Sequence, residues 1–279
     1  MYKIGVVGAG VMGSSIAQCF AQYGYSVLLM DSSQSVLHNA EKAIFRSLSF
    51  QKFSAQNDNP KQILARITII QELSMMHDCD IVIESITESW KDKESLYREL
   101  DAICKKHCIF ASNTSCISIT QIASVTNRPL NIIGIHFMNP IPSISTVEVI
   151  RGYHTSEETV QATIKVLQSI EKKAIIVNDL PGFVTNRISH VFMNEAAFVV
   201  QDGIASAEDV DAIFKECYGH KMGPLETADL IGLDTIVNSL DVLYESYHDT
   251  KYRCCPFLRK LVYAGHLGRK TGKGFHEYF

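Results

Sequence analysis

Two kinds of residue in this sequence have the types and spacing that chemistry requires: polar side chains at the ends of apolar runs, and closely spaced glycines. His136 lies near the end of the apolar run 132–137, and Glu148 lies within the run 147–150. A carboxylate among β-branched residues needs a polar partner, and a histidine can donate one ring N–H to it while the other nitrogen acts as a base. The two residues are therefore candidates for a catalytic pair, although a histidine satisfied within the core would give the same pattern.

A set of glycines follows the first apolar run of the chain and precedes a helical pattern. Gly8 permits a tight turn after a strand, Gly10 lets the backbone approach a pyrophosphate, and Gly13 lets the following helix pack on that strand. The N-terminus of that helix then faces the phosphates with its N–H groups. The spacing therefore predicts a dinucleotide-binding loop made of Gly8, Gly10, Val11, Met12 and Gly13.

The second apolar run ends at Asp31, about 20 residues past the glycines, where dinucleotide-binding proteins have a ribose-binding carboxylate. Such a carboxylate hydrogen-bonds the 2′-hydroxyl of NAD and repels the 2′-phosphate of NADP. Ser32 and Ser33 follow, and no arginine comes soon after them to receive a phosphate. The sequence therefore predicts NAD as the cofactor. The alternative is a plain βαβ unit in which Asp31 only caps a helix.

The overall composition excludes several classes of protein. With 46% hydrophobic and 20% charged residues among 279, the chain has the balance of a water-soluble globular protein with one large or two ordinary domains. The net charge of −4 argues against nonspecific nucleic-acid binding, and no apolar run is long enough to cross a membrane. The first strand begins at the N-terminus without room for a signal peptide, which predicts a cytoplasmic protein.

Eight cysteines are scattered along the chain, without a CxxC pair and without the Cys/His spacing of a zinc site. We therefore expect no metal centre, and free thiols in a reducing compartment. Cys116 follows a candidate active-site serine, Ser115, but a small apolar packing residue is the better interpretation of this cysteine.

Strand-like runs alternate with helical patterns as far as residue 178, which predicts an α/β protein with a doubly wound sheet. The expected strands cover residues 3–7, 25–30, 67–70, 80–85, 108–113, 132–137, 146–150 and 174–177. Beyond Leu180 only helical patterns occur, at 184–200, 207–217, 225–247 and 257–264. We therefore expect an N-terminal nucleotide-binding domain, 1–180, and an all-helical C-terminal domain, 181–279. The glycine-rich tail 265–275 is either flexible or tied back onto the helices.

Several longer motifs occur in one order along nearly the whole chain: IGVVGAGVMG, ESITE, FASNTSCISIT, GIHFMNPIP, TVEVI, DLPGFVTNRI, MNEA, MGPLETADLIGLD and LGRKTGKGF. Together they resemble the L-3-hydroxyacyl-CoA dehydrogenase family in its short bacterial 3-hydroxybutyryl-CoA dehydrogenase form. The resemblance implies an N-terminal Rossmann domain and a C-terminal helical domain that serves substrate binding and commonly forms a homodimer. It also implies an acyl-CoA substrate and a part in fatty-acid or butanoate metabolism.

The same resemblance implies catalytic roles for four residues. His136 would remove the proton of the C3 hydroxyl group, and Glu148 would orient His136 and stabilise its charged form. Ser115 would hydrogen-bond the C3 oxygen of the substrate. Asn186 would complete the site, and because it lies beyond the expected boundary, the site would form between the two domains.

The resemblance also implies cofactor contacts outside the glycine loop. Glu88 and Lys93 match positions near the nicotinamide end of NAD, and Asn113 matches a position close to the nicotinamide ribose. Segment 50–61 is expected on the CoA side. It contains Lys52 and Lys61, but surface lysines need no special explanation and neither is assigned a role.

One segment departs from the family pattern beside the expected site. The family usually has an apolar residue, a lysine and a leucine at positions 144–146, where this chain has Ile144, Ser145 and Thr146. The leading prediction is therefore an NAD-dependent 3-hydroxyacyl-CoA dehydrogenase, and the departure motivates a relative that oxidises a non-CoA 3-hydroxy acid, such as a gulonate-type sugar acid. A non-catalytic NAD-binding protein is the third possibility, against which the intact catalytic residues argue.

Overall fold

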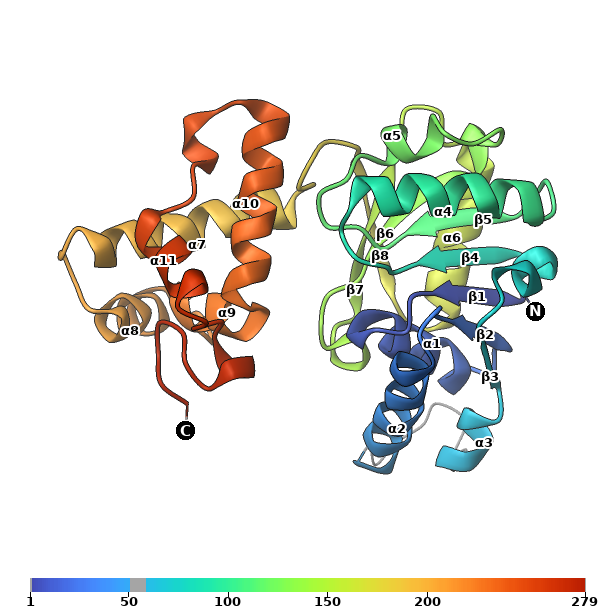
Figure 1. Ribbon diagram of the computed structural model, residues 1–279, viewed down its shortest axis with the longest axis horizontal. Coiled ribbons are helices and arrows are strands. Elements are labelled where there is room, and N and C mark those ends of the chain that lie inside the picture. The colour runs from blue at the N-terminus through green and yellow to red at the C-terminus, as the bar shows by residue number, and fades with distance from the viewer. Residues whose placement is uncertain (1, 51–58, 279) are drawn as a thin grey trace. The chain divides into compact units, whose positions relative to one another are not determined.

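The computed structural model of the protein describes residues 2–50 and 59–278 (Figure 1). The chain divides into two compact units, with the division between Asp179 and Leu180. The first unit is a sheet covered by helices, and the second is built from helices, each with its own hydrophobic core. The predicted fold class, an α/β unit followed by a helical one, is confirmed.

The first unit is built on an eight-stranded sheet with the strand order β3-β2-β1-β4-β5-β6-β7-β8. The strands are β1 (Ile4–Val7), β2 (Val27–Met30), β3 (Ile67–Ile70), β4 (Ile81–Glu84), β5 (Ile109–Ser112), β6 (Ile132–His136), β7 (Thr146–Arg151) and β8 (Lys173–Asn178). Strands β1 to β6 are parallel. The strand order reverses direction between β1 and β4, which is the point where open α/β sheets bind ligands.

The last two strands run opposite to the other six: β7 is antiparallel to β6, and β8 is parallel to β7. Only residues 137–145 connect β6 to β7. A parallel crossover needs a dozen or more residues, so a connection this short returns the chain in the opposite direction. The consequence for the site is that the start of β7 lies beside the end of β6.

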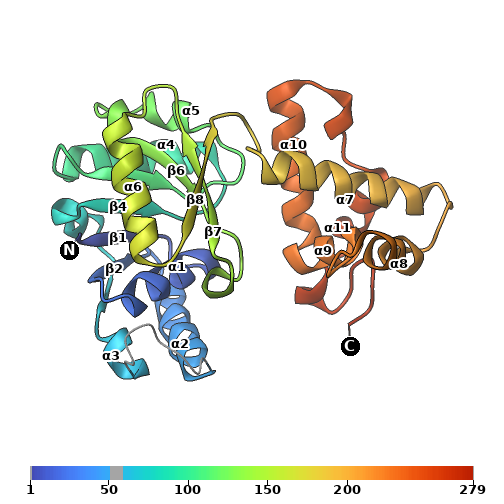
Figure 2. The ribbon, with the colours of Figure 1, turned by 180° about the vertical axis from the view of Figure 1, so that it is seen from behind.

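Helices cover both faces of the sheet (Figures 1 and 2). They are α1 (Val11–Gln22), α2 (Gln34–Phe50), α3 (Pro60–Leu64), α4 (Trp90–Ile103), α5 (Ile119–Ala123) and α6 (Glu157–Ser169), with the short 3₁₀ helices η1 (Leu73–Asp78), η2 (Pro129–Asn131) and η3 (Ile141–Ser143). Residues of α1, α2 and α6 share one core cluster with the strands. On the other face α4 packs on β5, where the rings of Tyr97 and Phe110 are 6.0 Å apart. Because both of its faces are covered there, the middle of the sheet, β1, β4 and β5, is buried along its whole length.

The second unit consists of α7 (Thr185–Gln201), α8 (Ala207–Tyr218), α9 (Pro224–Ile231), α10 (Leu233–Tyr247) and α11 (Pro256–Tyr263), with η4 (Thr250–Tyr252) and η5 (Arg269–Thr271). The prediction of one helix over 225–247 is wrong, because the chain breaks at Gly232 into α9 and α10. Gly232 has a φ of 108°, which side chains other than glycine rarely permit and which no α-helix contains.

The C-terminal tail is tied back onto this unit. The carboxylate of Asp229 accepts hydrogen bonds from the N–H groups of Phe275 and His276, at 3.0 and 2.9 Å, and from the Tyr278 hydroxyl at 3.0 Å. Two isolated β-bridges within the tail also pair Lys273 with Gly268 and with Glu277. Of the two possibilities that the sequence left open for this tail, the structure has the anchored one.

Candidate active site

The glycine loop lies between β1 and α1, at the carboxyl end of the parallel strands. Gly8 has a φ of 97°, and a Cβ there would lie 2.5 Å from the carbonyl oxygen of Ser85. A Cβ on Gly13 would lie 1.8 Å from the carbonyl oxygen of Gly8. Glycine at position 8 thus lets the loop pass close to the residue after β4, and glycine at position 13 lets the helix contact the loop. Gly10 differs, because a Cβ there would have no atom within 4 Å. The protein itself does not need this glycine, but a pyrophosphate approaching the backbone does.

The first turn of α1 faces this open space. Gly10 is the N-cap residue, no side-chain hydrogen bond caps the helix, and its first turn contains no acidic residue. Val11 is 72% exposed and Met12 packs partly against the core. The positive end of the helix, with the N–H groups of its first turn, is thus suited to bind an anion.

Asp31 follows β2 and holds the glycine loop. Its carboxylate accepts hydrogen bonds from the N–H groups of Ala9 and Ser33, both at 2.9 Å. An ionised carboxylate has about four lone-pair positions, so both oxygens can also accept from ribose hydroxyls. Asp31, Gly8 and Gly10 line one pocket of about 530 Å³. The loop, the helix N-terminus and this carboxylate together fit a dinucleotide.

His136 and Glu148 lie directly opposite each other on the antiparallel strands β6 and β7. Opposite residues of such a pair have their side chains on the same face of the sheet, so the register brings the imidazole and the carboxylate together. His136 Nδ1 is 2.8 Å from Glu148 Oε2, and both side chains are buried. Because an ionised carboxylate can only accept, we assign the hydrogen to Nδ1, and Nε2 then carries a lone pair.

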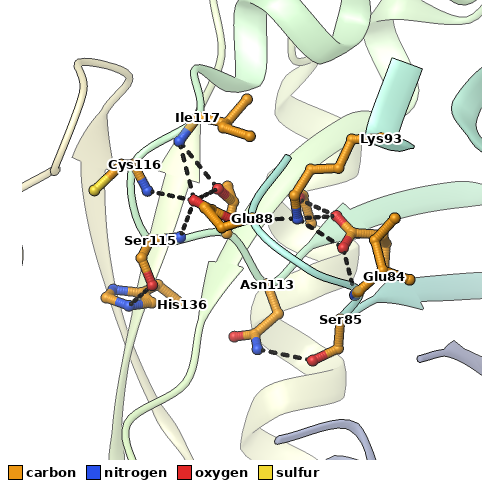
Figure 3. Close-up of polar contacts among 12 residues, drawn as sticks. Glu84, Ser85, Glu88, Lys93, Asn113, Ser115, Cys116, Ile117 and His136 are labelled. Carbon is orange, nitrogen blue, oxygen red and sulfur yellow. Dashed lines mark hydrogen bonds and ion pairs between the residues drawn. The ribbon is translucent and has the colours of Figure 1, made fainter. Parts of the chain in front are cut away.

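Ser115 lies at that second nitrogen. Its hydroxyl oxygen is 3.3 Å from His136 Nε2 (Figure 3). Ser115 belongs to the segment between β5 and α5, residues 113–118, which we call the serine loop. The imidazole is therefore held by a carboxylate at one nitrogen and has a hydroxyl group at the other, which is the arrangement of a positioned general base.

Glu88 holds the serine loop in place. Its Oε1 atom accepts from the N–H groups of Ser115 and Cys116, at 3.0 and 2.9 Å, and from the hydroxyl group of Thr114 (Figure 3). Burial acts to raise the pKa of the Glu88 carboxyl, but the Lys93 ammonium and these donors outweigh burial and hold that pKa below its usual range. The loop that carries Ser115 is thus bound to an ionised carboxylate.

Lys93 connects Glu88 to a second carboxylate. The Lys93 side chain is fully buried in α4, and its ammonium donates to both oxygens of Glu84, at 2.7 and 2.8 Å, and lies 3.3 Å from Glu88 Oε2. Glu84 ends β4 and also accepts from the Ser112 hydroxyl at 2.6 Å. Buried charges require this kind of pairing. One ammonium shared by two carboxylates therefore links β4, α4 and the serine loop.

Asn113 ties together the ends of three strands. Its Nδ2 donates to the Ser85 hydroxyl oxygen at 3.2 Å, and its Oδ1 accepts from the N–H of Phe137 at 3.0 Å. Ser85 follows β4, Asn113 follows β5 and Phe137 follows β6. The amide thus fixes the spacing between the end of β4, which faces the glycine loop, and the residue after His136.

Asn186 lies in the second unit, in the first turn of α7. The residue is 8% exposed, and its backbone carbonyl oxygen is 3.1 Å from His190 Nδ1. The structure thus brings the expected residues of the first unit to one edge of the sheet, whereas the expected part of Asn186 in the site stays a prediction.

Sequence reasoning missed two residues that hold this edge, Glu84 and Thr114. Glu84 is completely buried, and its Oε1 also accepts from the N–H of Ile86 at 2.8 Å. A signal for it exists: a carboxylate at the end of a buried strand requires a cation, and Lys93 follows on the next helix. The role of Thr114 depends on the fold of the loop, so the sequence contains no comparable signal for it.

Two further expectations concern other parts of the chain. Lys52 lies outside the described residues, and Lys61 is exposed in α3, where it lines a pocket of about 300 Å³ with Glu41 and Ile44. Within residues 2–50 and 59–278, no group of three or more His, Cys, Asp or Glu residues could hold a metal ion. Within the same ranges, no helix is both long and apolar enough to span a membrane.

Comparison with known proteins identifies the family of this chain. The family model described as "3-hydroxyacyl-CoA dehydrogenase, NAD binding domain" matches residues 3–180, and the one described as "3-hydroxyacyl-CoA dehydrogenase, C-terminal domain" matches residues 182–278. The chain is 44% identical over 277 residues to a probable 3-hydroxybutyryl-CoA dehydrogenase of Deinococcus radiodurans, covering 99% of this chain and 100% of that protein. A protein of the same description from Bacillus subtilis is 45% identical, with 99% of this chain and 97% of that protein covered.

A solved structure is similar over the same length. The crystal structure of (S)-3-hydroxybutyryl-CoA dehydrogenase from Ralstonia eutropha has a TM-score of 0.90 and 39% sequence identity to this chain, and the match covers 100% of this chain and 99% of that one. Both units of this chain therefore have relatives throughout their length. The chain belongs to the 3-hydroxyacyl-CoA dehydrogenase family, and it is an NAD-dependent oxidoreductase of that family.

Proposed function

We propose that this protein oxidises a 3-hydroxyacyl-CoA at C3 to the 3-ketoacyl-CoA, with His136 as the general base. The observation that carries this proposal is the arrangement around the imidazole. Glu148 is 2.8 Å from Nδ1, and the Ser115 hydroxyl oxygen is 3.3 Å from Nε2. A histidine fixed in this way can take the proton of an alcohol at one nitrogen while its other N–H stays bound to a carboxylate.

The protein's own residues handle the proton and the oxygen. His136 Nε2 accepts the proton of the C3 hydroxyl group, and the imidazolium that forms is stabilised by the Glu148 carboxylate. Ser115 and Asn186 donate hydrogen bonds to the C3 oxygen as its charge changes. When bound, NAD supplies the acceptor for the hydride that leaves C3. In the reverse direction the same imidazolium returns its proton to the oxygen of a 3-ketoacyl thioester.

The cofactor residues have separate tasks in this proposal. Gly8, Gly10 and Gly13, together with Val11 and Met12, would bind the pyrophosphate at the N-terminus of α1. Asp31 would bind the ribose hydroxyls and repel the 2′-phosphate of NADP.

The polar network would hold the other end of NAD. Glu88 and Lys93 would lie near the nicotinamide end of NAD, and Asn113 would lie close to the nicotinamide ribose, as the family resemblance implies. Because Glu88 is bound to the serine loop, the same residue would connect cofactor binding to the placement of Ser115.

We favour a short-chain acyl-CoA as the substrate. The support is that the two similar proteins from Deinococcus radiodurans and Bacillus subtilis are described as probable 3-hydroxybutyryl-CoA dehydrogenases and match this chain at 44% and 45% identity. The segment Ile144–Thr146, which departs from the usual family pattern, favours a second candidate, the oxidation of a non-CoA 3-hydroxy acid such as a gulonate-type sugar acid.

The test is NADH consumption at 340 nm with acetoacetyl-CoA, comparing the wild type with His136→Ala. Removal of a positioned general base is expected to lower kcat by about 10²- to 10⁴-fold. NADPH is expected to support much slower turnover than NADH because of Asp31. Wild-type activity on free 3-hydroxy acids but not on 3-hydroxybutyryl-CoA would favour the second candidate. Turnover that His136→Ala leaves unchanged would refute the role of His136.

We also propose that the helical unit forms a homodimer. The support is the set of large apolar side chains that this unit exposes, including Ile188 at 65%, Ile204 at 73% and Tyr218 at 70%. Light scattering at micromolar concentration is expected to give twice the chain mass, and a monomer mass would refute the dimer. A cytoplasmic location stays a prediction of the sequence, which cell fractionation would test.

A further inference from the structure

Lys172 is a buried lysine next to the proposed site to which the mechanism assigns no task. It lies between α6 and β8, and its side chain is nearly buried, with 6% of the residue exposed. Its ammonium donates to the carbonyl oxygens of Ile141 and Ile144, at 2.6 and 2.8 Å. Both carbonyls belong to residues 137–145, the segment that connects β6 to β7, which we call the connecting segment.

The partners of this ammonium are unusual for a buried charge. Buried lysines are normally paired with carboxylates, because removing an ammonium from water is costly. Among residues 2–50 and 59–278 no ion pair involves Lys172, and its ammonium donates to two neutral carbonyl oxygens. An apolar side chain of similar length would fill the same space at a lower cost. The distinctive contribution of Lys172 is therefore to hold two carbonyl groups of the connecting segment.

The next residue holds the same segment through its backbone. The N–H of Lys173 donates to the carbonyl oxygen of Ser145 at 2.7 Å, and Lys173 is paired with Thr146 in the register of β7 and β8. The side chain of Lys173, in contrast, is exposed. Two consecutive lysines thus differ in one respect that an experiment can use: only the ammonium of Lys172 contacts the connecting segment.

The connecting segment lies between the two halves of the proposed site. It begins at the residue after His136, and Glu148 follows it on β7. Its short helix η3 packs against α1, the helix that follows the glycine loop, and Ile141 is 1% exposed within the same core cluster as residues of α1. Displacement of this segment would therefore move the Glu148 strand relative to His136, and would also move residues 144–146.

We propose that Lys172 is a positioning residue, whose ammonium fixes the connecting segment and thereby the geometry of the His136–Glu148 pair. This proposal rests on the proposed function of that pair. It also gives a task to the segment that departs from the family pattern, because the Ile144 carbonyl held by Lys172 belongs to it. Lys172 contacts neither substrate nor cofactor in this proposal and acts only through the backbone of residues 141–144.

The test compares Lys172→Met with Lys173→Met, the matched control that removes a neighbouring exposed ammonium. The measurements are kcat and KM with acetoacetyl-CoA and NADH, NADH binding by fluorescence, and thermal unfolding. Lys172→Met is expected to lower kcat by about 10- to 100-fold, because misplacement of reacting groups by as little as 1 Å has effects of this size. Its NADH dissociation constant is expected to stay within about twofold of the wild type, since the glycine loop is unchanged. Lys173→Met is expected to match the wild type in all four measurements.

A conservative variant separates positioning from mere stability. Lys172→Arg keeps a cation that can donate to two carbonyl oxygens, and it is expected to recover most of the kcat that Lys172→Met loses. A Lys172→Met enzyme with wild-type kcat and only a lower melting temperature would overturn the proposal. If Lys172→Met does not fold, Lys172→Gln is measured by the same criteria, and wild-type kcat in that variant would equally overturn it.

Failure of the positioning role of Lys172 can be distinguished from failure of the proposed function. That function fails if wild-type enzyme does not turn over 3-hydroxyacyl-CoA, or if His136→Ala leaves turnover unchanged. The Lys172 variants are compared with a wild type whose turnover depends on His136, so an unchanged kcat in them refutes the positioning role alone.

Discussion

The glycine loop and the serine loop follow parallel strands of one sheet and lie at the same edge of it, but they are built in different ways. The glycine loop is one continuous stretch, residues 8–13, whose shape depends on side chains that are absent. The serine loop depends on side chains that arrive from elsewhere: Glu88 binds its N–H groups, and His136 contacts Ser115. His136 is itself held by Glu148 from a third strand.

This difference determines how each half of the site fails. Replacing a glycine of this loop by alanine adds one carbon atom, which occupies space that the cofactor needs. The stability of the protein changes only where the new Cβ would touch another part of the chain. The serine loop fails when a partner is removed, because a buried polar group without its partner loses both position and stability. Variants of the two halves should therefore separate cofactor binding from turnover.

The largest effect in this comparison is expected for Glu148→Gln. The amide has almost the same shape as the carboxylate but no charge to stabilise the imidazolium of His136. We expect kcat with acetoacetyl-CoA to fall by about 10²-fold, within the range for the loss of acid–base assistance, and NADH binding to stay unchanged. Steady-state kinetics at 340 nm and fluorescence titration with NADH measure the two quantities.

Glu157→Gln is the matched control for that variant. Glu157 also forms an ion pair, with Arg151 at 2.8 Å, but its side chain is 56% exposed on α6. Exposed pairs contribute little, so this variant is expected to keep wild-type kinetics. Equal kinetics in both variants would remove the distinction between the two halves of the site.

The next effect concerns Gly10→Ala and its neighbour Gly13→Ala. A Cβ at position 10 has no protein atom within 4 Å, so Gly10→Ala should fold with nearly wild-type stability. It should nevertheless bind NADH roughly 10- to 100-fold more weakly, because a methyl group that displaces the pyrophosphate costs a charge-assisted hydrogen bond of about 1.5–3 kcal/mol. Gly13→Ala should instead destabilise the first unit, because its Cβ would lie 1.8 Å from the Gly8 carbonyl oxygen. Calorimetry and NADH titration distinguish the two; wild-type NADH affinity in Gly10→Ala would argue against pyrophosphate binding at this loop.

The difference between the glycine loop and the serine loop also explains which features could be predicted from the sequence. The glycine loop and Asp31 belong to a local pattern, so their spacing alone predicted a nucleotide-binding loop, and the buried strands were predicted from their apolar runs. The antiparallel direction of β7 was not part of the prediction. Its signal was present in the length of the connecting segment, which is too short for a parallel crossover.

The pairing of His136 with Glu148 could not be derived from spacing either, because it depends on the direction of β7. Two residues twelve positions apart face each other only if the strands are antiparallel and the register is known. The carbonyl contacts of Lys172 depend on packing between distant elements, which no local pattern encodes, whereas Glu84 at the end of a buried strand did leave a signal in the sequence. Gly232 lies between these two extremes. The sequence shows a glycine at this position, but it does not show the φ of 108° that ends α9 there.

The smallest expected effect concerns the charge of Glu88, which makes the stability of the serine loop depend on pH. The pKa of this carboxyl is held below its ordinary value of 4.5 in the folded protein, against the effect of burial, by Lys93 and the donors of the serine loop. Its stabilising contribution is therefore fully present above pH 4.5 and is lost as the pH falls through the lower folded-state value. At neutral pH the wild type should be more stable than Glu88→Gln, and this difference in Tm should narrow below pH 4.5, by about 2–4 °C for each 1 kcal/mol lost.

Gly10→Ala adds no ionisable group, so its Tm should differ from the wild type by a constant amount over the same range. Thermal unfolding of the three proteins in a pH series measures both differences. A constant difference for Glu88→Gln as well would mean that the serine loop is held by the shape of the Glu88 side chain and not by its charge.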